Sequence, residues 1–188
     1  MKLERLEPSR SVLLVIDIQE KLAPAMRSEI AAAVIKQTLT LVAASARLGI
    51  PVVASEQYPQ GLGATVPELA AALRDAKATM FSKVEFSAVQ APAFADIYPT
   101  LGARDQWICA GMEAHICVWQ TVRDLRARGL QTHVASDAVA SRRKANWRTG
   151  LELARSAGAV VSGTETILFD WLGRAGTPEF KELSRLIR

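Results

Sequence analysis

Short unbroken apolar runs alternate along this chain with longer stretches in which apolar residues recur at helical spacing. Residues 11–17 form a β-branched apolar run that ends in a carboxylate, which is typical of a central parallel strand covered on both faces. Residues 29–48 have helical spacing, and Gly49 is suited to the left-handed cap that follows. The pattern predicts strands at 11–17, 51–54, 79–81, 106–110, 132–135 and 159–161. It predicts helices at 29–48, 65–73, 92–98, 117–128, 145–157, 164–172 and 178–187.

Turn and cap signals separate these elements. A loop rich in proline and glycine at 56–63 follows the second strand, and the fourth strand is expected to break at Gly111. Thr65 and Glu68 have the spacing of a capping box at the start of a helix. Strands that alternate with helices of this length imply right-handed crossovers. We therefore expect an α/β fold, a three-layer α/β/α sandwich around a six-stranded, mostly parallel, Rossmann-like sheet.

Length and composition favour one soluble globular unit. The chain has 188 residues, enough for one sizeable core and short for two, so we expect a single domain over residues 1–188. Hydrophobic residues make up 49% and charged residues 22%, the balance of an ordinary globular protein. The unbroken apolar runs, such as residues 12–16, are far shorter than the ~20 residues of a membrane-spanning helix, so we expect no membrane partner.

Charge and cysteine content narrow the setting further. The formal net charge is +4, and the basic residues are scattered apart from a short cluster at 142–144, which does not predict a nucleic-acid partner. Two cysteines, Cys109 and Cys117, cannot form a disulfide scaffold of the kind that secreted domains use. Residues 1–10 are polar and charged rather than an apolar signal segment. We expect both thiols to be free and the protein to be cytoplasmic.

The segment 111–121 contains the clearest candidate for chemistry. It places Cys117 in the first turn of a helix that follows a strand and a short loop, where amide dipoles and unpaired N–H groups favour a thiolate and can receive an oxyanion. Taken alone, the segment favours the simpler interpretation that Cys117 is a small buried hydrophobic residue. Asp17 and Lys83 change this, because the carboxyl ends of the first, third and fourth parallel strands lie along one edge. An acid, a cation and a thiol around one cleft are what nucleophilic catalysis requires.

These motifs resemble those of the isochorismatase-like hydrolase superfamily. The resemblance rests on Val15-Ile16-Asp17-Ile18-Gln19, on Phe81-Ser82-Lys83 and on residues 111–117. Residues 55–63 and 165–169 resemble the subgroup of isochorismatase domain-containing proteins. The resemblance spans nearly the whole chain.

The resemblance implies a site with defined parts. These are a catalytic triad of Asp17, Lys83 and Cys117, a cis peptide bond between Met112 and Glu113, and an oxyanion hole made by the backbone N–H groups of Glu113 and Cys117. The resemblance also implies a homo-oligomer, with helices near Trp119 or the C-terminal tail at the contact.

The chain departs from the metal-binding branch of the superfamily. Nicotinamidases hold a metal through an Asp-x-His after the second strand and a further histidine, whereas this chain has Glu56-Gln57-Tyr58 there. The two histidines, His115 and His133, cannot recreate that arrangement. Residues 61–63 resemble the start of a dinucleotide fingerprint, but Val66 stands in place of its third glycine. We expect no catalytic metal and no cofactor.

The main hypothesis is a cysteine hydrolase that acts on a small amide or related carbonyl compound through a thioester on Cys117. Asp17 would serve as general base, and Lys83 would stabilise the charges. Isochorismatases proper cleave a vinyl ether without a cysteine nucleophile, so a vinyl ether hydrolase is one alternative. A catalytically silent oligomeric binding module is another. Candidates for the lining of a small-molecule pocket are Gln19, Gln57, Tyr58, Phe86 and His115, while Cys109 and His133 are expected in the core.

Overall fold

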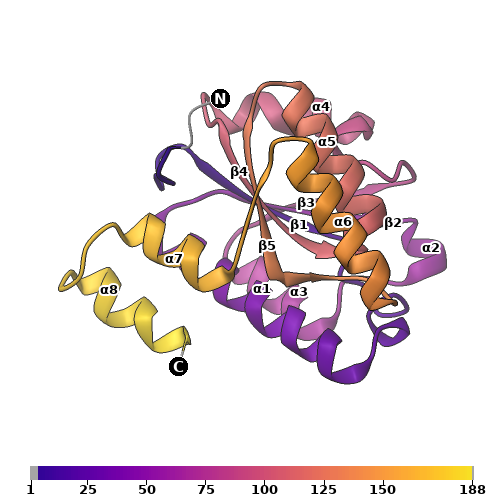
Figure 1. Ribbon diagram of the computed structural model, residues 1–188, viewed down its shortest axis with the longest axis horizontal. Helices are drawn as coiled ribbons and strands as arrows, with labels where there is room; N and C mark the ends of the chain where they lie inside the picture. The colour runs from indigo at the N-terminus through magenta and orange to yellow at the C-terminus, as the bar shows by residue number, and fades with distance from the viewer. Residues whose placement is uncertain (1–3, 188) are drawn as a thin grey trace.

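The computed structural model describes residues 4–187, which form a six-stranded parallel sheet with helices on both faces (Figure 1). The strands lie in the order β3-β2-β1-β4-β5-β6, and every neighbouring pair is parallel. The expected α/β sandwich is confirmed. The strands are β1 Ser11–Ile16, β2 Val52–Gln57, β3 Thr79–Lys83, β4 Gln106–Met112, β5 Gln131–Ala140 and β6 Val160–Ser162. The helices are α1 Ser28–Leu48, α2 Pro59–Leu62, α3 Pro67–Asp75, α4 Pro92–Ile97, α5 Trp119–Ala127, α6 Lys144–Ser156, α7 Thr164–Leu172 and α8 Pro178–Leu183.

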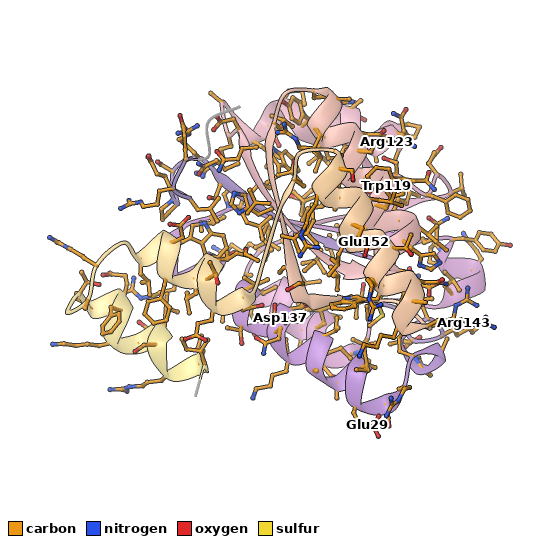
Figure 2. All side chains as sticks on the ribbon, viewed as in Figure 1. Glu29, Trp119, Arg123, Asp137, Arg143 and Glu152 are labelled. Carbon is orange, nitrogen blue, oxygen red and sulfur yellow. The ribbon has the colours of Figure 1, made fainter. Side chains whose placement is uncertain are left out.

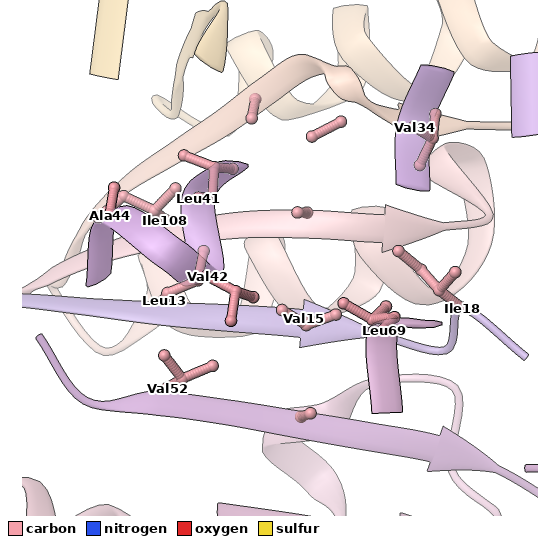
Figure 3. Close-up of a cluster of buried hydrophobic side chains, with 14 of the residues drawn as sticks. Leu13, Val15, Ile18, Val34, Leu41, Val42, Ala44, Val52, Leu69 and Ile108 are labelled. Atoms are coloured by element: carbon pink, nitrogen blue, oxygen red, sulfur yellow. The ribbon is translucent and has the colours of Figure 1, made fainter. Parts of the chain in front are cut away.

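Two hydrophobic clusters, one on each face of the sheet, explain the unbroken apolar run of β1. Leu13 and Val15 belong to the cluster under α1, where Figure 3 shows them beside Leu41 and Leu69. The alternate side chains of β1, from Val12 to Ile16, belong to the cluster under α4, α5 and α6. Each fully buried leucine or isoleucine contributes about 2 kcal/mol of transfer free energy. A strand covered on both faces therefore needs an apolar side chain at every position.

Helix α1 is long and apolar enough, by length and composition, to cross a membrane. Its buried side chains, among them Val34 and Leu41, pack into the cluster under the sheet, as expected of a core helix. The survey of unbroken apolar runs did not flag this segment as long enough to cross a membrane, because Lys36 and Gln37 interrupt its apolar residues.

Several expected element boundaries were wrong. β2 extends to Gln57, so residues 56 and 57 end a strand instead of opening a loop. β4 continues through Gly111 to Met112. A glycine within a strand can mark the close approach of another backbone as well as the end of the strand. Gly111 has a φ of 135°, and a Cβ on it would collide with the backbone of Ile16 on β1. A side chain is therefore excluded at this point of the strand.

The expected capping box was also wrong. α3 begins at Pro67, a residue that has no N–H to donate and suits the first position of a helix. Thr65 instead donates from its backbone N–H and its hydroxyl to the Glu56 carboxylate, at 2.7 and 2.8 Å. The pair therefore joins the loop after α2 to the end of β2. Similarly, α5 begins at Trp119, after a π-helical turn at Ala114–Val118 that contains Cys117.

His133 on β5 is a buried core residue, as its apolar strand predicts. Its Nε2 lies 3.0 Å from the Gln131 side-chain amide nitrogen, which fits a neutral ring that accepts this hydrogen bond. Burial lowers the pKa of His133 to about 4. In the unfolded chain His133 is protonated near pH 6.5, whereas in the folded chain it is protonated only near pH 4. Folding stability is therefore lost as the pH falls from about 6.5 to about 4.

We expect His133→Gln to reduce the acid sensitivity of the fold. The loss of unfolding free energy between pH 7 and pH 4.5 should shrink by about 2 to 3 kcal/mol, because the neutral amide cannot be protonated. Denaturant unfolding across this pH range measures the change. The control His115→Gln removes the other histidine and should keep the contribution of His133. An unchanged pH slope in His133→Gln would contradict the expectation.

Candidate active site

Asp17 lies at the centre of a buried polar cluster at the carboxyl end of β1. It has a left-handed φ of 54°, and it is fully buried. Its backbone N–H donates to the Ser55 carbonyl at 3.1 Å, and its Oδ1 accepts from the Ser55 hydroxyl at 2.7 Å. Residues in this sparsely populated backbone region persist where the surroundings fix them. Here the neighbouring strand β2 fixes both the backbone and the carboxylate of Asp17.

Lys83 at the end of β3 forms an ion pair with Asp17. Its Nζ lies 2.7 Å from Asp17 Oδ2, and the two side chains have no solvent exposure. The same nitrogen donates to Gln57 Oε1 at 2.7 Å and to the carbonyls of Glu85 and Phe86 at 3.2 and 3.3 Å. A buried ion pair is tolerated when its remaining hydrogen-bonding capacity is used in this way. Gln57 thus holds the lysine head in place.

Cys117 reaches the same cluster from the turn between β4 and α5. The residue is 6% exposed, and a hydrogen bond with Asp17 is among the interactions that raise the pKa of its thiol. Burial raises the pKa of Cys117 to about 12, the Asp17 and Glu113 charges add to this, and Lys83 opposes it. The inference that this position favours a resting thiolate was wrong, because burial and two carboxylates outweigh one cation.

The electrostatics of Asp17 complement those of the thiol. Burial raises the pKa of Asp17, while Lys83, Ser55 and Cys117 lower it. The resting arrangement is therefore a protonated thiol facing a carboxylate whose proton affinity is increased by its dry surroundings. Such a carboxylate can take a proton from the sulfur when the sulfur forms a bond.

The segment that follows β4 shapes the crevice beside Cys117. The Met112–Glu113 peptide bond is cis, at the place that the family resemblance implies. The Glu113 carbonyl accepts from the N–H groups of Ile116 and Val118 at 3.0 and 3.3 Å. The Glu113 carboxylate accepts from Arg142, from the backbone N–H at 2.8 Å and from Nε at 3.1 Å. The loop is thereby fastened to the chain just after β5.

The five candidate pocket residues fall into three groups. Gln57 contacts Lys83, and the Phe86 backbone does so too, while the Phe86 ring and Tyr58 are exposed. Gln19 is fully buried, and its amide donates to the Gln57 and Gly63 carbonyls at 3.0 and 2.6 Å, which joins two loops. His115 lies apart from the triad in its hydrogen bonds.

The His115 ring is held by two side chains of the β5 and α6 region. Its Nδ1 lies 3.0 Å from the Ser141 hydroxyl and its Nε2 lies 3.1 Å from the Asn146 amide. Both ring nitrogens are thus occupied within the protein. The geometry gives His115 the role of an anchor for the loop.

Within residues 4–187, no group of three or more His, Cys, Asp or Glu side chains is placed to hold a metal ion. Glu56, which occupies the place of a metal ligand in the nicotinamidase branch, bonds to Thr65.

Sequence reasoning missed three residues that shape this region: Ser55, Arg142 and Gly150. Ser55 could have been noticed as a polar residue that directly follows an apolar strand. It stands in register with Ile16, the residue before Asp17. No local sequence pattern marks Arg142 or Gly150. Both act on loop residues that lie about 30 or more positions earlier in the sequence.

Gly150 lets helix α6 touch the loop that carries Cys117. A Cβ on Gly150 would lie 2.5 Å from the Ala114 carbonyl oxygen and 2.8 Å from the His115 nitrogen. These atoms are backbone and cannot turn aside as a flexible side chain could. Figure 2 labels Glu152 on α6 and Trp119 at the start of α5, and the two helices lie side by side on this face. The close approach of α6 therefore fixes the height of the loop above the sheet.

Comparisons with known proteins agree with this architecture. The family model described as isochorismatase domain matches residues 11–166. The secreted isochorismatase effector Isc1 of Phytophthora sojae is 37% identical over 188 residues, covering 100% of this chain and 89% of that protein. The structure of MAR1 ribonuclease from Caenorhabditis elegans has a TM-score of 0.87 at 36% identity, covering 98% of this chain and 92% of that chain. The YcaC gene product of Escherichia coli, described as an octameric hydrolase of unknown specificity, shares the fold with a TM-score of 0.83 at 20% identity, covering 93% and 85%.

We expect Gly150→Ala to destabilise the protein, although alanine is the better helix former. Helix propensity alone predicts a gain of about 1 kcal/mol, whereas overpacking against the loop backbone predicts a loss of about 1 to 3 kcal/mol. Denaturant unfolding gives the sign, and hydrogen exchange should become faster in residues 112–118. Thr149→Ala, at the exposed neighbouring position, is the matched control and should be neutral or stabilising. A stabilised Gly150→Ala variant with unchanged loop exchange would refute the contact.

Proposed function

This chain belongs to the isochorismatase family of hydrolases, and from that premise we propose that it is a cysteine hydrolase that cleaves a small amide or related carbonyl compound through a thioester on Cys117. The observation that carries the proposal is the single buried cluster in which the Asp17 carboxylate contacts both the Lys83 ammonium and the Cys117 thiol. Vinyl ether cleavage does not need a thiol at this place. Acyl transfer does, because it needs a nucleophile next to a base.

The first half of the proposed reaction forms the thioester. The substrate carbonyl carbon is attacked by Cys117 Sγ while Asp17 accepts the thiol proton, so no free thiolate has to persist in the buried site. Lys83 balances the negative charge that spreads over the sulfur and the carboxylate. The backbone N–H groups of Glu113 and Cys117 receive the oxyanion. Asp17 then gives its proton to the leaving amine as the carbon–nitrogen bond breaks.

The second half releases the acid. Asp17, again a carboxylate, accepts a proton from a water molecule that attacks the thioester carbonyl. The carbon–sulfur bond breaks, Cys117 recovers a proton, and the carboxylic acid leaves. The net reaction consumes one amide and one water and yields one acid and one amine. Gln57 positions Lys83, while the exposed rings of Tyr58 and Phe86 are proposed to contact the substrate.

The setting of the enzyme is part of the proposal. We propose a homo-oligomer in the cytoplasm that takes a small-molecule substrate and has no nucleic-acid or membrane partner and no cofactor. The octameric description of the Escherichia coli relative supports self-association. Half-buried Trp119 on α5 and the C-terminal tail are the proposed contact surfaces between subunits.

Replacing the thiol tests the chemistry directly. A panel of small amides is screened for ammonia release, with intact-mass detection of an acyl adduct. We expect Cys117→Ala to abolish the adduct and to lower turnover by about a thousandfold or more, because the residual environment lacks a nucleophile. Cys109→Ala removes a buried core thiol and should keep both signals.

Three other outcomes would contradict the proposal. Cleavage of a vinyl ether in place of amides, with turnover that survives in Cys117→Ala, would favour vinyl ether hydrolysis. Cleavage of an RNA oligonucleotide in place of amides would favour the activity by which the Caenorhabditis elegans relative is described. The absence of both an adduct and turnover with every amide would favour a catalytically silent binding module.

Removing the Ser55 hydroxyl tests the role of Asp17 as base. The Ser55 hydrogen bond lowers the pKa of Asp17, so its loss should raise that pKa and move the acidic limb of the kcat/KM profile to higher pH, by about one unit. The pH–rate profile of Ser55→Ala measures the shift. Ser45→Ala removes a buried hydroxyl of α1 and should leave the profile unchanged. A shift to lower pH, or none, would exclude Asp17 as the titrating base.

A further inference from the structure

A hollow of about 400 Å³ lies between the start of α1, the end of β5 and the start of α6. In Figure 2, Glu29 at the start of α1 and Arg143 at the start of α6 lie on the same side of the molecule. The volume of the hollow lies within the range of small-molecule sites. Asp17, Lys83 and Cys117 do not line it. Its lining includes Arg27, Ile30, Asp137, Arg142, Lys144 and Trp147.

The walls of the hollow are apolar and partly fixed. Ile30, near the start of α1, is 44% exposed and lines the hollow. Val34 and Val139 are buried beneath it, and the Trp147 ring forms one side. The Trp147 indole N–H donates to the Ser136 carbonyl at 3.3 Å, which sets the direction of the ring. A flat apolar group would find an ordered wall to lie against.

Three cationic side chains line the hollow. Arg27 is paired only at 3.8 Å, with Glu29, and both side chains are highly exposed. Lys144 is exposed at the start of α6. Arg142 uses Nε for Glu113, and its side chain remains 56% exposed. Of the three lining cations, Arg27 and Arg142 thus already have a carboxylate partner.

One carboxylate on the lining opposes these cations. Asp137 accepts from the backbone N–H and the hydroxyl of Thr164 at 2.8 and 2.9 Å, so its Oδ1 is committed to the start of α7. Glu113 pairs with Arg142 and Glu29 pairs with Arg27, so among residues 4–187 Lys144 is the lining cation that has no ion-pair partner. The Lys144 ammonium, together with the exposed guanidinium groups of the two arginines, favours an anion at this place.

We infer that this hollow binds a small organic carboxylate with a flat apolar body. The carboxylate lies among the Arg27, Arg142 and Lys144 side chains, and the apolar body lies against Trp147 and Ile30. Arginine and lysine side chains bind carboxylates through charge-assisted hydrogen bonds, which are stronger than hydrogen bonds between neutral groups. The inference does not depend on the chemistry at Cys117, because it concerns a different set of side chains.

The ring is kept constant and the charge varied to test this. Benzoate, benzyl alcohol and benzylamine are titrated separately against the full chain, and tryptophan fluorescence is followed. We expect saturable benzoate binding, at least tenfold weaker binding of the neutral alcohol, and no binding of the amine. The benzoate signal should disappear in Trp147→Phe, since the other three tryptophans, Trp107, Trp119 and Trp171, do not line the hollow. Equal binding of benzoate and benzyl alcohol would overturn the inference.

A charge-removal pair locates the bound anion. The double variant Arg27→Ser with Lys144→Ser should bind benzoate at least tenfold more weakly than the unchanged protein. The matched double variant Arg74→Ser with Arg155→Ser removes two exposed cations outside the hollow and should keep the affinity. Equal losses in the two variants would show nonspecific attraction and overturn the inference.

Occupation by a second copy of the chain is the competing outcome. In that case benzoate would not bind, and Ile30→Glu would lower the particle mass measured by light scattering. Both observations together would overturn the inference. Saturable benzoate binding with an unchanged mass in Ile30→Glu supports it.

Discussion

The buried ion pair between Asp17 and Lys83 is the interaction on which the rest of the structure depends. Neither side chain touches solvent, so each charge must be satisfied inside the protein. Ser55, Gln57 and two backbone carbonyls supply the remaining hydrogen bonds. Removing one partner of such a pair costs about 3 to 5 kcal/mol, because it leaves an uncompensated charge. The three strands β1, β2 and β3 are thus held in register by the same contacts that build the site.

The protonation state of Cys117 follows from this constraint. A thiol at the start of a helix is often a good thiolate, because the dipole and free N–H groups stabilise it. Here the thiol is buried beside two carboxylates, and one cation that is already paired does not compensate. A carboxylate that is itself buried becomes a stronger base. The cluster therefore pairs a protonated thiol with a carboxylate of raised proton affinity, as the proposed mechanism requires.

The sequence predicted the layers and the strands well because both faces of the sheet are covered. Apolar runs such as 11–17 and turn glycines such as Gly49 have few structural meanings, and the observed β1 and α1 agree with them. Boundaries at the carboxyl ends were less predictable. Gly111 continues a strand because of a contact with Ile16, which lies 95 positions earlier, and no local pattern reports such a contact. The meeting of Asp17, Lys83 and Cys117 was predictable from parallel topology, but the anchoring by Arg142 and Gly150 was not.

The missing side chain at Gly111 has a consequence for how similar crevices can be recognised. The backbone of β4 approaches the residue just before Asp17 so closely that any Cβ would displace the end of β1. A chain could keep a cysteine, a lysine and an aspartate at matching positions and still be unable to bring them together. A glycine at the exit of the fourth strand is therefore a more demanding filter for this geometry than the three reactive side chains.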